Sequence, residues 1–124
     1  MDNQLFVNDI VRFFFTIQLL VKQYHWRTTS FARHKASGQL LDNLDGNIDK
    51  FIEVFIGRYN VKPEITSLKF NKIFLSDDGN MKLLLEACQY LEGLNNIIKD
   101  SELLNIRDEL VADLNQTIYL YNLK

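Results

Sequence analysis

The sequence predicts an all-α protein, a four-helix bundle folded as a single domain of 124 residues. Two observations predict this class. Helix breakers are scarce, since the chain has five glycines and one proline. Apolar residues also recur at steps of three and four along four separate stretches, which is the spacing of one face of an α-helix. Because 47% of the residues are hydrophobic, the chain can build a core, which excludes a disordered protein.

The first helix is expected over residues 4–26. Phe14, Phe15 and Leu19 widen its apolar stripe, so we expect this helix to be buried on more than one side. A short polar break follows the helix, and Ser30 within it is a good N-cap for the next one.

The second helix is expected over residues 31–58, with Gly57 near its end as the C-cap. Gly38 and Gly46 lie inside this helix, and each costs up to about 1 kcal/mol relative to alanine. The close approach of another backbone would explain why the helix tolerates them.

The third and fourth helices are expected at about residues 78–99 and 102–122, with Ser76 and Ser101 as N-terminal caps. The link over residues 59–76 is long, with room for one helical turn. About eighteen residues can span the ~30 Å length of a helix, so the second and third helices can run parallel, joined by a crossover. A ferritin-like four-helix bundle has this connectivity.

Composition excludes several classes of function. The net charge of -2 argues against a general DNA-binding protein, and the single cysteine, Cys88, excludes disulfide frameworks and multi-cysteine zinc sites. The N-terminus lacks the positive charges of a signal peptide, and the apolar stretch 13–21 is about half a membrane span. We therefore expect a cytoplasmic protein with no membrane partner.

An acidic stripe runs along the second helix beside its apolar face. At 100° per residue, His34, Asp42, Asp45, Asp49 and Glu53 fall within one sector of roughly 100°. Carboxylates beside a buried seam can bind metal, and they can equally form a solvated acidic face. Asp42 and Asp45 fit the solvated face better.

Distance along the helix decides how a metal site could form. Asp49 and Glu53 follow His34 by about 22 and 28 Å, so they cannot share a metal with His34 of their own chain. Two copies of the helix packed antiparallel about a two-fold axis near residues 42–43 would bring them together, twice per dimer. The tight turn before the second helix brings His25 close to His34. This nitrogen and oxygen set suits Fe(II), Zn(II) or Mn(II), although His25 could also be a polar residue that ends its helix.

These residues resemble the ferroxidase signature of the Dps proteins, or mini-ferritins. The pattern comprises His25-Trp26, then His34, then Asp49-x-x-x-Glu53 fifteen residues later. The surrounding residues, about 5 to 60, resemble most closely the short, mostly uncharacterised ferritin-like proteins of tailed phages and large DNA viruses. Three features depart from Dps: Gly38 stands where that family has a third acid, the turn between the two histidines is shorter, and residues 1–11 contain no Lys or Arg, so the DNA-binding lysine tail is missing.

The resemblance implies a Dps-like protein that oxidises and sequesters Fe(II) at sites between subunits. His25, His34, Asp49 and Glu53 would hold the iron, with Zn or Mn as other candidate metals. The protein would form a two-fold dimer and, in the family's pattern, a closed dodecamer. The alternative is a ferritin-like oligomerisation or structural protein without catalysis, associated with a virion or a host protein.

Overall fold

The computed structural model describes residues 2–123 as four long helices, and these residues form no strand. The helices and the two short 3-10 helices are α1 (Asn3–Arg27), α2 (Phe31–Tyr59), η1 (Lys72–Leu75), α3 (Asp77–Glu92), η2 (Gly93–Asn96) and α4 (Ser101–Tyr121). The predicted all-α class and the four helices are confirmed.

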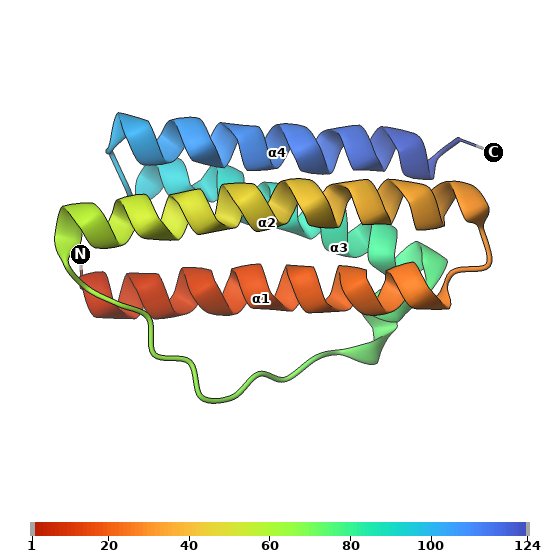
Figure 1. Ribbon diagram of the computed structural model, residues 1–124, viewed down its shortest axis with the longest axis horizontal. Helices are drawn as coiled ribbons and strands as arrows, with labels where there is room; N and C mark the ends of the chain where they lie inside the picture. The colour runs from red at the N-terminus through yellow and green to blue at the C-terminus, as the bar shows by residue number, and fades with distance from the viewer. Residues whose placement is uncertain (1, 124) are drawn as a thin grey trace.

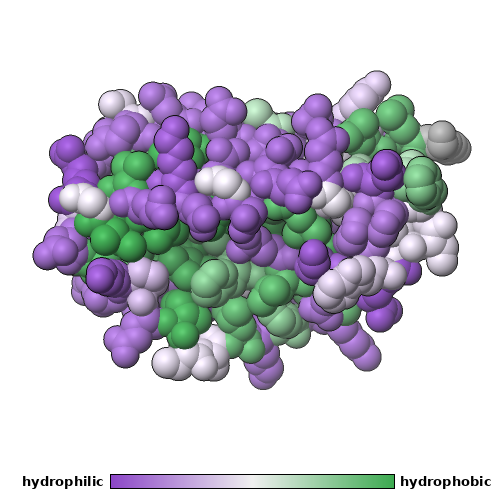
Figure 2. Space-filling model, viewed as in Figure 1, coloured by the Kyte–Doolittle hydropathy of each residue, from purple (hydrophilic) through white to green (hydrophobic). Residues whose placement is uncertain are grey.

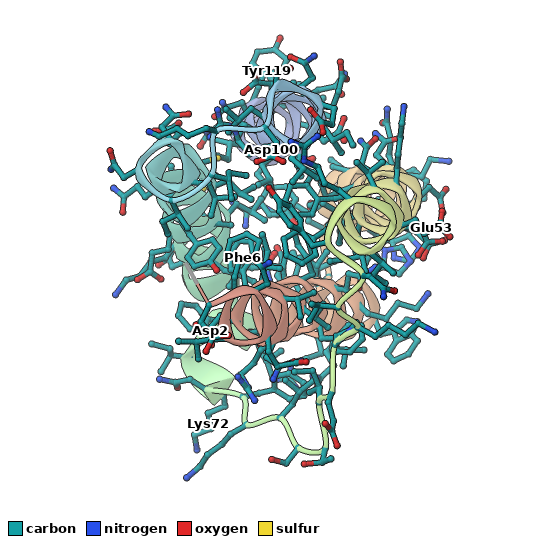
Figure 3. All side chains as sticks on the ribbon, turned by 90° about the vertical axis from the view of Figure 1, so that its left-hand side faces the viewer. Asp2, Phe6, Glu53, Lys72, Asp100 and Tyr119 are labelled. Carbon is teal, nitrogen blue, oxygen red and sulfur yellow. The ribbon has the colours of Figure 1, made fainter. Side chains whose placement is uncertain are left out.

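The four helices surround one core, and each helix packs against two neighbours. α1 and α4 each pack against both α2 and α3, as the view along the bundle shows (Figure 3). α1 and α4 run in one direction and α2 and α3 in the other, so α2 and α3 are parallel (Figure 1). Residues 60–76 make the long crossover that joins them along the length of the bundle (Figure 1).

The crossover lies over α1 and is attached to its first turns. The Gln4 side chain donates to the Lys62 carbonyl at 2.9 Å, and Asn8 Oδ1 accepts from the Glu64 amide at 2.9 Å. The expected helical turn in this link is η1, which begins after Asn71 and leads directly into α3. The crossover therefore covers one side of α1 and leaves the side next to α2 open.

Interlocked aromatic rings fill the core between α1 and α2. Phe14 meets Phe51 edge to face with centroids 5.6 Å apart, and Phe6 contacts Phe55 at 5.3 Å. Figure 3 shows Phe6 pointing into the bundle. By length and composition α1 is also apolar enough to cross a membrane, while its inward residues are buried in this core.

The predicted caps are right for α2 and α3 at their N-termini, where the Ser30 and Ser76 side chains accept from Arg33 and Gly79 amides. At its C-terminus α2 passes Gly57 and ends at Asn60, whose φ of 54° supplies the left-handed cap. The expectation that Gly57 is the C-cap was therefore wrong. Asparagine tolerates this conformation better than most residues do.

The third helix is shorter than expected and the fourth begins differently. α3 ends at Glu92, where η2 tightens the chain, so the expected end near residue 99 was wrong. The N-cap of α4 is Asp100 rather than Ser101, and its side chain does not cap the helix. Its carboxylate instead accepts from the Tyr59 hydroxyl at 2.6 Å and pairs with Arg58 at 2.8 Å.

Candidate metal site

The two histidines of the chain lie together at the hairpin between α1 and α2. His25 is in the last turn of α1 and His34 in the first turns of α2, separated by the three-residue turn 28–30. Their rings are stacked with centroids 3.9 Å apart and planes 15° apart. The prediction that the turn brings these rings close is confirmed.

Each of the two rings is oriented by a hydrogen bond at its own Nδ1 atom. His34 Nδ1 lies 2.9 Å from the carbonyl oxygen of His25. A carbonyl only accepts, so this Nδ1 carries the proton and the Nε2 of neutral His34 keeps a free lone pair. His25 Nδ1 lies 2.9 Å from the hydroxyl of Ser37, which is fully buried and donates to the His34 carbonyl at 3.1 Å.

The space for the His25 ring depends on a glycine. A Cβ built on Gly38 would lie 3.0 Å from His25 Cε1. Partial burial, followed by the nearby charge of His34, lowers the pKa of His25 below its ordinary value. The neutral imidazole, which is the form that binds metal, is therefore favoured at this position.

The candidate acids lie apart from the histidines. Asp42, Asp45, Asp49 and Glu53 are all exposed, and Figure 3 shows Glu53 at the outer surface of α2. Among residues 2–123, no group of three or more His, Cys, Asp or Glu side chains could hold one metal ion. Within one chain the structure therefore brings His25 and His34 together and leaves Asp49 and Glu53 farther along the helix.

The histidine rings line an open groove of about 590 Å³ that crosses the start of α2. Lys35 and Asp42 also line it, together with Leu120 at the end of α4. The imidazoles are therefore reachable from solvent, as ligands for a metal ion must be.

An apolar surface lies next to the acidic stripe. Phe15, Leu19 and Trp26 on α1 are 39%, 44% and 68% exposed, so the expectation that Phe15 and Leu19 widen the buried face was wrong for the single chain. A groove of about 570 Å³ runs between Phe15 and Leu19 on one side and Leu41 on the other. Figure 2 shows hydrophobic surface along α1, below a hydrophilic strip over α2. We call this surface the α1–α2 face.

A polar network centred on Arg33 connects all four helices, and the sequence pattern did not predict it. Arg33 of α2 donates to the Tyr24 hydroxyl of α1 at 3.0 Å and to the Asp77 carbonyl of α3 at 2.9 Å. Its Nε donates to the Tyr121 carbonyl of α4 at 3.2 Å, and Tyr24 donates to the Asp77 carboxylate at 2.6 Å. No local pattern could have found it, because its members are far apart in sequence.

Fold and site together define a four-helix bundle with a long crossover and a paired-histidine site at one end. A family model, described as a family of unknown function (DUF5856), matches residues 25–121. The chain therefore belongs to this family. No curated protein matches the chain, and no solved structure matches it.

Proposed function

We propose that this protein is a ferritin-like, Dps-like protein that binds and oxidises Fe(II) at sites shared between two copies of the chain. The observation that carries the proposal is the stacked pair His25 and His34 with both Nδ1 atoms engaged in hydrogen bonds. Because His34 Nδ1 donates to a carbonyl, the Nε2 of neutral His34 keeps a lone pair that can bind a metal, and the ring of His25 lies against it. The crossover between the parallel α2 and α3 supports the ferritin-like assignment.

The charge pattern of α2 supports pairing with a second copy. Residues 31–41, the first part of α2, carry Arg33 and Lys35 and no acid, whereas Asp42, Asp45, Asp49 and Glu53 follow with one lysine between them. Antiparallel pairing of two α2 helices sets the basic half of each against the acidic half of the other. Such complementary charge favours this pairing over a parallel one.

The α1–α2 face supplies the apolar area for such a dimer. Phe15 and Leu19 lie on α1, which runs antiparallel to α2, beside the middle of α2 where the two-fold axis would pass. Exposed apolar surface rimmed by charge is typical of an interface between proteins. If this face paired with the same face of a second copy, Phe15 and Leu19, which are exposed in the single chain, would become buried.

The ligand set fits iron as the substrate. In the dimer, His25 and His34 of one copy would meet Asp49 and Glu53 of the other, which offers two neutral nitrogens and two carboxylates. Two negative charges balance Fe(II), and mixed nitrogen and oxygen ligands suit this ion, with Zn(II) and Mn(II) as competitors. Each Fe(II) would lose one electron to oxygen or peroxide, and the chain's role is to bind and orient the ion.

A mixing experiment tests the shared site. One variant carries His34→Ala and the other carries Asp49→Asn with Glu53→Gln, and each alone should lose most of its Fe(II) oxidation. Refolded together at equal amounts, half of the dimers are mixed and each mixed dimer has one intact site of two. Isologous symmetry therefore predicts recovery of about one quarter of the wild-type rate.

The control for this mixture is Glu86→Gln, which neutralises an exposed acid on α3 and should leave the rate unchanged. No recovery in the mixture, with each variant folded and dimeric, would contradict a shared site. Self-association without any iron oxidation would instead favour the alternative, a structural oligomerisation protein.

A further inference from the structure

We propose that Ser37 is a positioning residue that selects the tautomer of His25 and so leaves its Nε2 free to bind a metal. The inference deepens the proposed function and rests on it for the role of the metal. Ser37 lies one turn after His34 on α2 and is fully buried, so its hydroxyl must find its partners within the protein.

The single proton of the Ser37 hydroxyl decides which nitrogen of His25 is protonated. A serine hydroxyl has one proton to donate, and that of Ser37 is directed to the His34 carbonyl at 3.1 Å. The oxygen of the same hydroxyl is 2.9 Å from His25 Nδ1. With its proton in use, Ser37 can only accept in this second bond. His25 Nδ1 therefore carries the hydrogen, and Nε2 of the neutral ring has the lone pair.

The same helix turn fixes the second ring by an independent contact. His34 Nδ1 donates to the backbone carbonyl of His25, which no side-chain substitution removes. Ser37 therefore acts on His25 alone, although the two rings are in contact. His34 becomes an internal control for any change at Ser37.

Gly38 completes the arrangement by leaving space for the ring. Because a Cβ at residue 38 would lie 3.0 Å from His25 Cε1, only glycine lets the ring rest against α2 without a shift. Ser37 and Gly38 are consecutive, so one backbone segment supplies both the hydrogen-bond partner and the space. Partners that orient a ligating histidine typically contribute tenfold to a hundredfold to metal affinity.

The test reads the tautomers directly in the metal-free protein. The protein is labelled with ¹⁵N only in histidine and measured by magic-angle-spinning NMR, which works for any assembly size. The measurement is made at about pH 8.5, above the ordinary histidine pKa of about 6.5. His34→Gln assigns the signals. Wild-type protein should show a protonated Nδ1 and an unprotonated Nε2 in both rings.

Ser37→Ala removes the acceptor and should move the His25 ring to the Nε2-protonated tautomer, while His34 keeps its own. Ser37→Thr retains a hydroxyl and should restore the wild-type pattern, with circular dichroism to show that each variant is folded. Zn(II) affinity, measured by calorimetry on the assembled protein, should fall about tenfold or more in Ser37→Ala and recover in Ser37→Thr.

Two spectroscopic results would overturn the role of Ser37. One is a wild-type His25 that already carries its proton on Nε2, and the other is a Ser37→Ala spectrum with unchanged or equally altered rings. Failure of the proposed function looks different. In that case the wild-type protein binds neither Zn(II) nor Fe(II), although its His25 tautomer still depends on Ser37. That result would contradict the metal function and leave the positioning role of Ser37 standing.

Discussion

The ring of His25 occupies the space that a side chain at residue 38 would need, since a Cβ on Gly38 would lie 3.0 Å from His25 Cε1. The resemblance to Dps proteins predicts an acid at this position. The structure gives a physical reason for the difference, because the Cβ of an acidic side chain here would press against the imidazole and push it from its place. In this chain the glycine favours the stacked histidine pair over a third carboxylate.

Gly38→Ala should separate metal binding from stability. The new methyl group pushes the His25 ring away from α2, so we expect Zn(II) affinity to fall several-fold. Alanine also has a higher helix propensity than glycine, by up to about 1 kcal/mol. This gain offsets the cost of the contact between the new methyl group and the His25 ring, which can move. Urea unfolding should therefore show little loss of stability. A variant that binds Zn(II) as tightly as the wild type would contradict the importance of this contact.

Gly46→Ala should stabilise the chain and weaken its self-association. A Cβ at Gly46 meets nothing within 4 Å in the chain, so alanine should add up to about 1 kcal/mol to the free energy of unfolding. Gly46 lies near the middle of α2, where a second α2 would cross. Analytical ultracentrifugation should show a dissociation constant raised several-fold.

The matched control for Gly46→Ala is Gly57→Ala. Its Cβ also meets nothing within 4 Å, and it lies eleven residues farther along α2, away from the proposed two-fold axis. It should stabilise the chain similarly and leave the dissociation constant unchanged. Equal effects of both substitutions on self-association would argue against close contact at Gly46.

Arg33→Lys should destabilise the fold through loss of the network that joins the four helices. Lysine cannot reproduce the separate bonds of the guanidinium to Tyr24, Asp77 and Tyr121, nor its packing 4.7 Å over the Tyr121 ring. We expect a cost of about 1–3 kcal/mol in urea unfolding, as for other charged hydrogen bonds. Arg27→Lys, an exposed change nearby, should stay within about 0.5 kcal/mol of wild type.

Stability should fall in mild acid because of His25. Burial and the neighbouring His34 lower its pKa in the folded state, so the unfolded chain binds the proton more readily. The contribution is present above the unfolded pKa of about 6.5 and is lost as the pH falls through the folded value. His25→Gln should flatten this part of the curve of urea midpoint against pH. An unchanged slope in His25→Gln would assign the effect to other groups.

The sequence by itself determined the all-α class, the four helices and the long crossover. Steps of three and four between apolar residues, scarce breakers and the serine caps Ser30 and Ser76 are local signals that report helices directly. The proximity of His25 and His34 also followed from the sequence, because a turn of three residues places the end of one helix beside the start of the next.

Only the tertiary structure decided which residues are buried and how the site is held. Phe15 and Leu19 match the helical period of the core yet stay 39% and 44% exposed, because the groove between them and Leu41 of α2 is not filled within the single chain. The Asp100 carboxylate does not cap α4 because it accepts a hydrogen bond from Tyr59 and pairs with Arg58. The bond from Ser37 to His25 and the space at Gly38 depend on the angle between α1 and α2, which no local pattern specifies.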